Sequence, residues 1–325
     1  MTTGPVEGTA HNGHDAAPRH GRFAGADPSE LTAAMWQLLD SGGASPTNRY
    51  VAVDGGTLHF LEEGVGRPLV MLHGASGGAA NWFRLIKPLS ELRRVLAPDL
   101  PGFGLSTAID AHAPLGKTVA GIILRWLDAL SVPSFDLVGT SFGGLVALRL
   151  AQLAPNRVRS LTLIDATGLG RTYPFLLRLM MLPPFAPLAL RASRRGTEWS
   201  LRRLMISDRR AIPPEMWQRL VEYLYQSARA TDVSKLARGF SLFSDLRGQR
   251  EVLSPDELRA LDVPTLLLWG EHDRFVPARH GRHAAALVPH SEFRIIPRAG
   301  HSPNWELPDE VIERMVPFLQ RGPAE

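Results

Sequence analysis

Ser141 stands in a short pattern that could make its hydroxyl a nucleophile. Residues 139–143 read Gly-Thr-Ser-Phe-Gly and match G-x-S-x-G, between an apolar run typical of a strand and one typical of a helix. So tight a turn strains the backbone of the central residue, and small neighbours let the turn pack closely on a sheet. The hydroxyl is raised beside a helix N-terminus, which favours developing negative charge. We predict that Ser141 is a nucleophile.

A serine hydroxyl of ordinary pKa is a poor nucleophile and needs a base. Of the 11 histidines, His301 lies in the loop sequence RAGHSPNWELP, just after the last strand-like run. Asp273 lies in LLLWGEHDRFVP, just after the preceding run. The carboxyl ends of strands in an open parallel sheet share one edge, where such proteins place their sites. We therefore expect Ser141, Asp273 and His301 to meet there.

Short apolar runs bounded by turn residues predict the strands that position these side chains. Runs of this length, with helical patterns between most of them, favour a mostly parallel, doubly wound α/β sheet covered on both faces. Residues 49–63 alternate around Asp54-Gly55-Gly56 and predict a hairpin. The predicted strands are Leu69–Leu72, Val95–Ala97, Phe135–Val138, Leu161–Ile164, Thr265–Trp269 and Phe293–Ile296.

Four motifs in this order resemble the α/β-hydrolase superfamily, from about residue 50 to residue 320. They are MLHGASGG at 71–78, APDLPGFG at 97–104, the Ser141 elbow, and the pair GEHDRFVP and GHSPNWE. The resemblance implies an α/β-hydrolase fold and a Ser141–His301–Asp273 triad. It also implies an oxyanion hole formed by the backbone N–H groups of Phe142 and Ala75.

The pattern divides the chain into an extension, a core and an insertion. Residues 1–46 are expected to be a flexible extension with a short helix near 27–40, begun by Asp27 and Pro28 with Glu30 at a capping-box spacing. The core is expected at 47–170 and 256–321. Residues 171–255 show no strand pattern and are expected to form a helical cap, as the family resemblance implies for an insertion at this place.

The predicted cap is both apolar and basic. Residues 171–250 contain 15 basic and 6 acidic residues on a chain of net charge +4. Three interpretations stay open: solvated arginines on outward helix faces, recognition of an anionic substrate, and attraction to an anionic membrane surface. Eight apolar residues could line the substrate site. They are Pro174, Phe175, Leu176, Leu179, Met180, Met181, Leu182 and Phe185.

Other polar residues near the motifs are expected to be structural. Asp165 follows a predicted strand, where some members of the family keep the triad acid, and the alternative is a turn or cap-support residue. Asp99 and His73 are expected to fix loops, and His272 to be a loop residue. His280 and His283 lie three residues apart without a third ligand, so we expect a solvated helix face and no metal.

The composition and short motifs exclude several kinds of site and several classes of protein. The chain has 325 residues and no cysteine, which excludes disulfides, thiolate nucleophiles and Cys-bound metals. No apolar run reaches the ~18 residues of a membrane span, and the N-terminus lacks a signal-peptide core, so we expect a cytoplasmic protein. HGASGGAA lacks the Lys-Ser/Thr of a phosphate loop. We expect no cofactor, no nucleic-acid partner and no membrane insertion.

These features predict a serine hydrolase that cleaves a carboxylic ester, or a related acyl compound, through an acyl-enzyme. The substrate is expected to have an apolar acyl or aromatic part and could be anionic. One alternative is carbon–carbon bond hydrolysis of ring-cleavage keto acids, which uses the same triad. Ala75-Ser76-Gly77-Gly78 and Ser302 depart from that group, which has a glycine-rich segment and a Trp after the histidine. Perhydrolysis and a non-catalytic binding protein also stay open.

Overall fold

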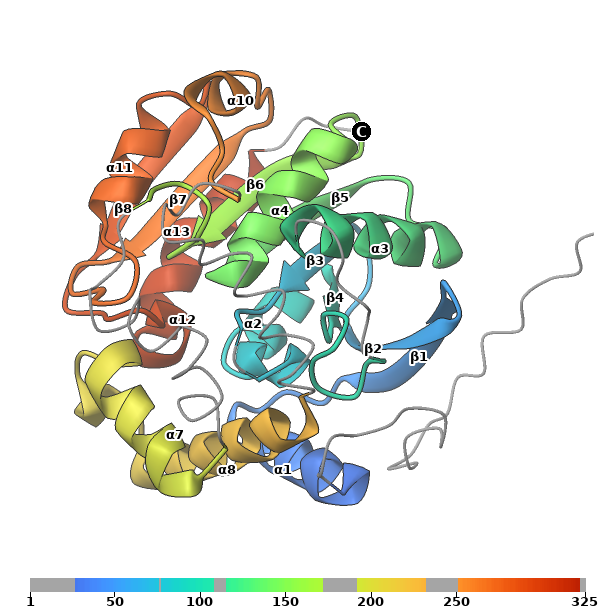
Figure 1. Cartoon of the computed structure of the whole chain (residues 1–325), viewed down its shortest axis with the longest axis vertical. Coiled ribbons are helices and arrows are strands. Elements are labelled where there is room, and N and C mark those ends of the chain that lie inside the picture. The colour runs from blue at the N-terminus through green and yellow to red at the C-terminus, as the bar shows by residue number, and fades with distance from the viewer. Residues whose placement is uncertain (1–26, 76, 108–114, 172–191, 232–250, 322–325) are drawn as a thin grey trace, which may run out of the picture.

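A computed structural model describes residues 27–75, 77–107, 115–171, 192–231 and 251–321 of the 325-residue chain (Figure 1). The strands in these residues are β1 (Thr47–Val53), β2 (Gly56–Glu63), β3 (Pro68–Leu72), β4 (Arg94–Pro98), β5 (Phe135–Thr140), β6 (Val158–Ile164), β7 (Thr265–Gly270) and β8 (Ser291–Ile296). They form one sheet in the order β1-β2-β4-β3-β5-β6-β7-β8. The β1–β2 and β2–β4 pairs are antiparallel, and the pairs from β4–β3 to β7–β8 are parallel. The predicted fold class is therefore confirmed.

The first two strands form the predicted hairpin. Val53 pairs with Gly56, and the two residues between them have positive φ, 52° at Asp54 and 75° at Gly55. Two-residue turns with positive φ at both positions match the twist of antiparallel strands, and Asp-Gly is a favoured sequence for them.

The central strands bury both of their faces. Val70 and Leu72 of β3 belong to one hydrophobic cluster, and Leu69 and Met71 belong to a second cluster on the opposite face. This alternation follows from the two-residue period of a strand. Helices on the first face are α3 (Leu115–Ala129), α4 (Phe142–Leu153), α10 (Pro255–Arg259) and α11 (Arg279–Ala285). Elements on the second face include η1 (Ala79–Trp82), α2 (Ile86–Ser90), α12 (Pro303–Glu306) and α13 (Pro308–Gln320).

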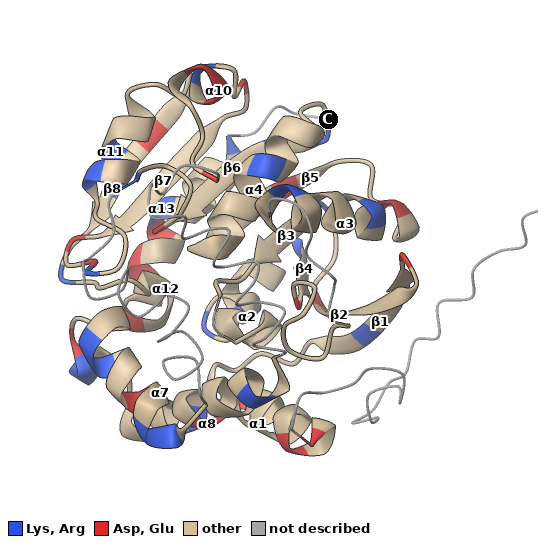
Figure 2. Ribbon diagram, in the orientation of Figure 1, with Lys and Arg blue, Asp and Glu red and all other residues tan. Residues whose placement is uncertain are grey.

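A group of helices, called here the inserted helices, lies between β6 and β7 in the chain. With α1 (Pro28–Ser41) they occupy one end of the molecule, and basic residues recur along α7 and α8 (Figures 1 and 2). No strand occurs in residues 192–231 or 251–259, as expected for a helical insertion. The inserted helices are α7 (Arg194–Ser200), the π-helical turn η2 (Leu201–Met205), η3 (Arg209–Ala211) and α8 (Pro214–Ala230).

Helix α1 packs against the inserted helices. Leu31 and Leu38 are buried in the same cluster as Leu220 and Leu224 of α8. Asp27 caps the helix by accepting a hydrogen bond from the Ser29 N–H at 2.8 Å.

Glu30 does not complete the expected capping box. Its carboxylate instead accepts a hydrogen bond from Arg229 of α8 at 2.8 Å. Glu30 therefore forms an ion pair between α1 and α8, although the local sequence pattern predicts that its side chain caps α1.

Some predictions fall outside the described residues. These are the flexible segment at 1–26 and the eight apolar residues at 174–185. The boundaries of the predicted cap, residues 171 and 255, stay predictions. Among the described helices, none is at once long enough and apolar enough to cross a bilayer.

Candidate active site

Ser141 occupies the turn between β5 and α4. Its backbone is strained, with φ 52° and ψ −118°. A Cβ on Gly143 would lie 2.1 Å from the carbonyl oxygen of Leu72, and a Cβ on Gly139 would lie 2.4 Å from that of Gly143. Glycine is required at both positions because the elbow touches neighbouring backbone. The G-x-S-x-G pattern thus has the steric basis expected from the sequence.

The loop after β6 holds the elbow in place. The Ser141 N–H donates to the carbonyl oxygen of Ile164 at 3.0 Å. The Ser141 carbonyl oxygen accepts from the N–H of Thr167 at 3.0 Å and from its hydroxyl at 3.2 Å. These bonds fix the main chain on both sides of the strained residue, so the side chain keeps one direction.

The three residues expected to meet at the sheet edge do so. Ser141 Oγ and His301 Nε2 lie 3.0 Å apart, and His301 Nδ1 lies 2.8 Å from Asp273 Oδ2. The side chains of His301 and Asp273 are 1% and 0% exposed, so water is excluded from the bond between them. A hydroxyl, an imidazole and a carboxylate in this line can relay a proton away from the serine oxygen.

Asp273 is held by its own loop. Its Oδ1 accepts from the N–H groups of Phe275 at 2.7 Å and Val276 at 2.9 Å, which leaves Oδ2 for His301. The ring of Phe275 packs on the imidazole, with centroids 4.8 Å apart. Carboxylate and imidazole are therefore both oriented by residues 275–276.

Asp165 lies beside this carboxylate. Its Oδ1 accepts from the Gly270 N–H at 2.9 Å, and its backbone has a φ of 46°. Burial, followed by the charge of Asp273, raises the pKa of Asp165 well above its ordinary value. A hydrogen bond to Asp273 also favours the neutral form of Asp165. Asp165 therefore lies beside Asp273 in surroundings that favour its protonated form, a contact that the sequence did not predict.

Asp165, Asp273 and His301 are also residue types that bind metals. One ligand atom from each lies within 4.8 Å of the others. However, the imidazole bonds to Asp273 and Ser141, and both carboxylates accept backbone N–H groups. All three side chains are therefore already hydrogen-bonded, so their arrangement favours proton transfer rather than metal binding.

The loop after β3 passes beside the serine. A Cβ on Gly74 would lie 3.2 Å from Ser141 Cβ, which is tighter than an ordinary contact. Glycine at position 74 therefore lets the backbone of this loop approach Ser141 closely. His73 braces the loop, because its Nδ1 donates to the Gly74 carbonyl at 2.7 Å and its Nε2 accepts from the Leu100 N–H at 2.8 Å. The predicted structural role of His73 is confirmed, while the oxyanion-hole role of Ala75 and Phe142 stays a prediction.

Asp99 fixes the same loop from the neighbouring strand. Its carboxylate accepts from the N–H groups of Ala79 at 2.6 Å and Leu105 at 2.7 Å. Its Oδ2 also lies 2.6 Å from His59 Nδ1, and His59 Nε2 lies 2.5 Å from Asn48 Oδ1. These contacts confirm Asp99 as a loop-fixing residue and extend its support to the β1–β2 hairpin.

Glu306 supports the histidine loop, a role that sequence reasoning missed. Its Oε1 accepts from the Gly300 N–H at 2.6 Å, and its Oε2 accepts from Ser207 at 2.7 Å and Asp208 at 3.0 Å. It therefore ties the residue before His301 to the inserted helices. The GHSPNWE motif contains Glu306, but nothing in its spacing indicates these partners.

The inserted helices touch the site at two further places. The His301 N–H donates to the carbonyl oxygen of Met205, the last residue of η2, at 2.7 Å. From α8, the Ser227 hydroxyl donates to the Gly77 carbonyl at 2.9 Å. The buried Tyr223 hydroxyl bonds to the backbone of Ala80. The histidine loop and the loop after β3 are thus both buttressed by the insertion.

The remaining histidines have different environments. His272 is an exposed loop residue, as expected, with its Nδ1 3.1 Å from Ser207 Oγ. His283 is exposed. His280 is 5% exposed, so its expected place on a solvated face is wrong: it packs where Gly170 has no Cβ, and burial followed by the charge of Arg279 lowers its pKa to about 4.

Comparison with known proteins gives four matches. A family model described as the alpha/beta hydrolase fold matches residues 67–308. A dihydrolipoyllysine-residue acetyltransferase component of an acetoin cleaving system from Pseudomonas putida is 31% identical over 91% of this chain and 78% of its own. A 2-hydroxy-6-oxo-6-phenylhexa-2,4-dienoate hydrolase from Burkholderia cepacia is 29% identical over 86% and 98%. Among solved structures, a membrane phospholipase A has a TM-score of 0.74 and 28% identity, over 89% of this chain and 90% of its own.

Proposed function

The chain belongs to the α/β-hydrolase family, and from this premise we propose that it is a serine hydrolase cleaving a carboxylic ester or a related acyl compound through an acyl-enzyme. The observation that carries the proposal is the pair of contacts at His301: 3.0 Å to Ser141 Oγ and 2.8 Å to Asp273 Oδ2. An idle serine does not require a strained backbone, a buried imidazole and a buried carboxylate in one line.

Each residue has one part in the proposed reaction. His301 Nε2 takes the proton of Ser141 as Oγ attacks the acyl carbon, and Asp273 stabilises the imidazolium. The N–H groups of Ala75 and Phe142 donate to the oxyanion. His301 then gives its proton to the leaving alcohol. Water, deprotonated by the same imidazole, attacks the acyl-enzyme, and His301 passes this proton to Ser141 Oγ as the acid is released.

The substrate class is proposed from the predicted cap. An apolar acyl chain or aromatic ring would suit the predicted apolar lining, and backbone donors beside Ser141 would bind the carbonyl oxygen. The inserted helices support a cap role because η2 and α8 contact the two loops that flank the serine.

A second candidate is hydrolysis of a carbon–carbon bond next to a ketone. The observation that favours it is the 29% identity to the Burkholderia cepacia hydrolase, which extends over 98% of that protein. Ser302 after His301 and the Ala75-Ser76 pair argue for the ester, because they depart from the pattern expected of that group.

The proposal is tested with p-nitrophenyl esters from acetyl to palmitoyl and with 2-hydroxy-6-oxo-6-phenylhexa-2,4-dienoate. Ser141→Ala is expected to lower ester turnover by at least about 10⁴-fold, because it removes the attacking oxygen. Ser291→Ala on β8 is the matched control, since its hydroxyl donates to the carbonyl oxygen of Ala285 in α11 and its removal should leave turnover unchanged.

The outcomes separate three functions. Ester turnover that depends on Ser141 supports an esterase, and the preferred chain length measures the pocket. Turnover of the dienoate alone, with fluorophosphonate labelling of Ser141, favours carbon–carbon hydrolysis. If no substrate turns over and the phosphonate does not label Ser141, the chain is a binding protein on this fold and the proposal fails.

A further inference from the structure

A groove on the inserted helices has more positive than negative charge. It encloses about 790 Å³ between α7, η2, η3, α8 and the edge of α1. Its lining includes three glutamates, Glu198, Glu215 and Glu222, and apolar contact from Pro214, Trp217 and Val221. Five arginines also line it: Arg194, Arg195, Arg202, Arg209 and Arg219.

Two of the arginines converge on one aromatic ring. The guanidinium carbons of Arg202 and Arg209 lie 5.1 and 4.5 Å from the ring centroid of Trp217, which is 3% exposed. Guanidinium groups stacked on an indole keep their N–H edges available for hydrogen bonds. Solvated arginines would be expected to separate, so this convergence distinguishes the groove from an ordinary basic surface.

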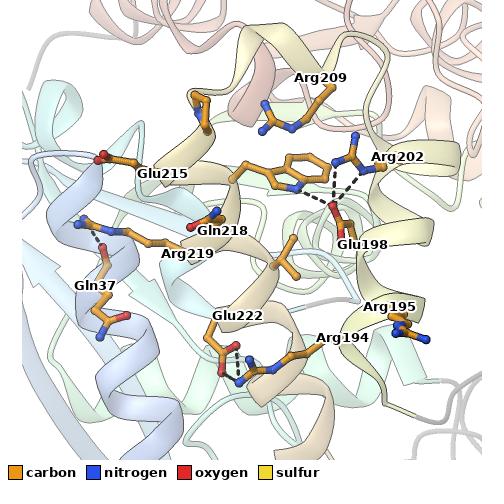
Figure 3. Close-up of a pocket in the computed structure, with 13 residues that line it drawn as sticks. Gln37, Arg194, Arg195, Glu198, Arg202, Arg209, Glu215, Gln218, Arg219 and Glu222 are labelled. Carbon is orange, nitrogen blue, oxygen red and sulfur yellow. Dashed lines mark hydrogen bonds and ion pairs between the residues drawn. The ribbon is translucent and has the colours of Figure 1, made fainter.

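The carboxylates of the groove do not balance this charge. Glu198 Oε1 accepts from Arg202 at 2.8 Å and from Trp217 Nε1 at 3.3 Å, and Glu222 pairs with Arg194 (Figure 3). Arg209 donates to the Ile212 carbonyl, while its Nε has no hydrogen-bond partner among the residues that the structure describes.

Among the lining residues outside these pairs, Arg195 and Arg209 outnumber one carboxylate, Glu215. Burial, and then the charge of Arg202, lowers the pKa of Arg209. Within the described part of the chain, Arg195 is exposed and makes no ion pair. Arg219 pairs with Asp40 outside the groove lining.

We propose that this groove binds a phosphate-bearing ligand, held by Arg202 and Arg209 with an apolar part of the ligand against Pro214 and Val221. A phosphate presents several acceptor oxygens and can accept N–H groups from two guanidinium groups at once. At Arg202 it would share these donors with Glu198, whose Oε1 accepts from both Nε and Nη2. The same phosphate chemistry could come from a soluble phosphate ester or from a lipid headgroup. The groove adjoins the active site in the chain, since Arg202 and Met205 belong to the same π-helical turn.

The test titrates the intact protein with phenyl phosphate by calorimetry and with vesicles of phosphatidylcholine containing phosphatidylglycerol by sedimentation. The double variant Arg202→Gln/Arg209→Gln is compared with Arg203→Gln/Arg210→Gln. Both remove two positive charges, but Arg203 and Arg210 are exposed and do not line the groove. Arg209→Lys is a third variant, which keeps the charge and removes the fork.

Saturable binding that is at least about tenfold weaker in the groove double variant, and unchanged in the control, is the expected result. Arg209→Lys should fall between them. Binding of phenyl phosphate identifies a soluble ester as the source, and binding of the vesicles alone identifies a headgroup. If neither probe binds, or if both double variants weaken binding equally, the proposal is overturned. Circular dichroism and melting temperatures show whether each variant is folded.

Discussion

The pair of carboxyl groups behind His301 is the unusual feature at the scale of single residues. Asp273 accepts three N–H groups, two from its own loop and one from the imidazole, whereas Asp165 accepts one and is fully buried. Two adjacent buried carboxylates cannot both carry charge without a large free-energy penalty. The proton therefore belongs on Asp165, which has fewer donors.

This assignment predicts unequal effects of two amide substitutions on catalysis. Asp273→Asn is expected to lower kcat for ester hydrolysis by about 10⁴-fold, because the amide favours the wrong imidazole tautomer. Asp165→Asn retains a neutral donor toward Asp273 and should change kcat less than about tenfold. Steady-state kinetics with a p-nitrophenyl ester measure both. The reverse order would identify Asp165 as the acid of the triad.

The raised pKa of Asp165 also predicts a pH dependence of stability. Above its ordinary value of 3.8 the unfolded chain loses this proton while the folded chain keeps it, so the free energy of unfolding falls as the pH rises. The loss is about 1.4 kcal/mol per pH unit up to the folded pKa. Asp165→Asn removes the effect, and its stability relative to wild type should rise between pH 4.5 and pH 8.

Urea unfolding at several pH values measures this difference. Asp256→Asn is the control, since that side chain is 94% exposed and should give the same difference at every pH. A flat curve for Asp165→Asn would mean that the buried carboxyl is ionised, contrary to the assignment.

At the scale of elements, the contact between the elbow and β3 leaves no space for a side chain. Gly143→Ala would bring a Cβ to 2.1 Å from the Leu72 carbonyl oxygen, and neither backbone can move without displacing Ser141. We expect a loss of about 3 kcal/mol or more in stability, and loss of ester turnover.

Gly121→Ala on α3 provides the matched comparison. Its Cβ would be 3.5 Å from an Arg125 nitrogen, an ordinary contact, so helix propensity should stabilise the protein by about 1 kcal/mol. Thermal melts and turnover of both variants check the prediction. Equal behaviour of the two alanines would contradict the steric account of the elbow.

Glu306 links two other elements, the loop before His301 and the segment after η2. Glu306→Gln turns one acceptor oxygen into a donor that faces backbone N–H groups, so we expect a loss of about 1–3 kcal/mol and a lower kcat. Glu313→Gln on α13, where the side chain is 79% exposed, should change neither. Urea titrations and esterase kinetics measure the pair. An unchanged kcat in Glu306→Gln would show that the His301 loop does not need this tie.

At the scale of the whole molecule, α1 and the inserted helices share one hydrophobic cluster with a face of the sheet. Leu38 is 0% exposed, and Leu38→Ala is expected to lower the free energy of unfolding by about 2–5 kcal/mol. The ion pairs of Arg219 with Asp40 and Arg229 with Glu30 are partly exposed and should contribute about 1 kcal/mol or less each.

Urea unfolding of Leu38→Ala and of Asp40→Asn/Glu30→Gln compares the two contributions. A larger effect of the charge variant would mean that electrostatics, not apolar burial, holds α1 to α8. A single transition in Leu38→Ala is expected, because the cluster extends into the sheet.

The sequence by itself predicted the strands of the sheet, their order along the chain and the three residues that meet at its edge. Hydrophobic periodicity and turn residues depend on neighbours in the chain, as at Asp54-Gly55, and parallel strands bring their carboxyl ends to one edge. These signals depend on neighbouring residues or on the order of the strands, so they can be interpreted without knowing how the elements pack in space. The constriction at Gly139 and Gly143 follows from the same reasoning.

Only the tertiary structure decided which side chains lie next to one another across distant segments. Glu306 binds the backbone of Ser207, 99 residues away, and Asp165 reaches Asp273 although different strands carry them. His280 is buried because a helix face and Gly170 fit together. Arg202 and Arg209 converge because the guanidinium groups of both lie over the ring of Trp217 in α8. Such contacts depend on how whole elements pack, and no pattern of neighbouring residues encodes them.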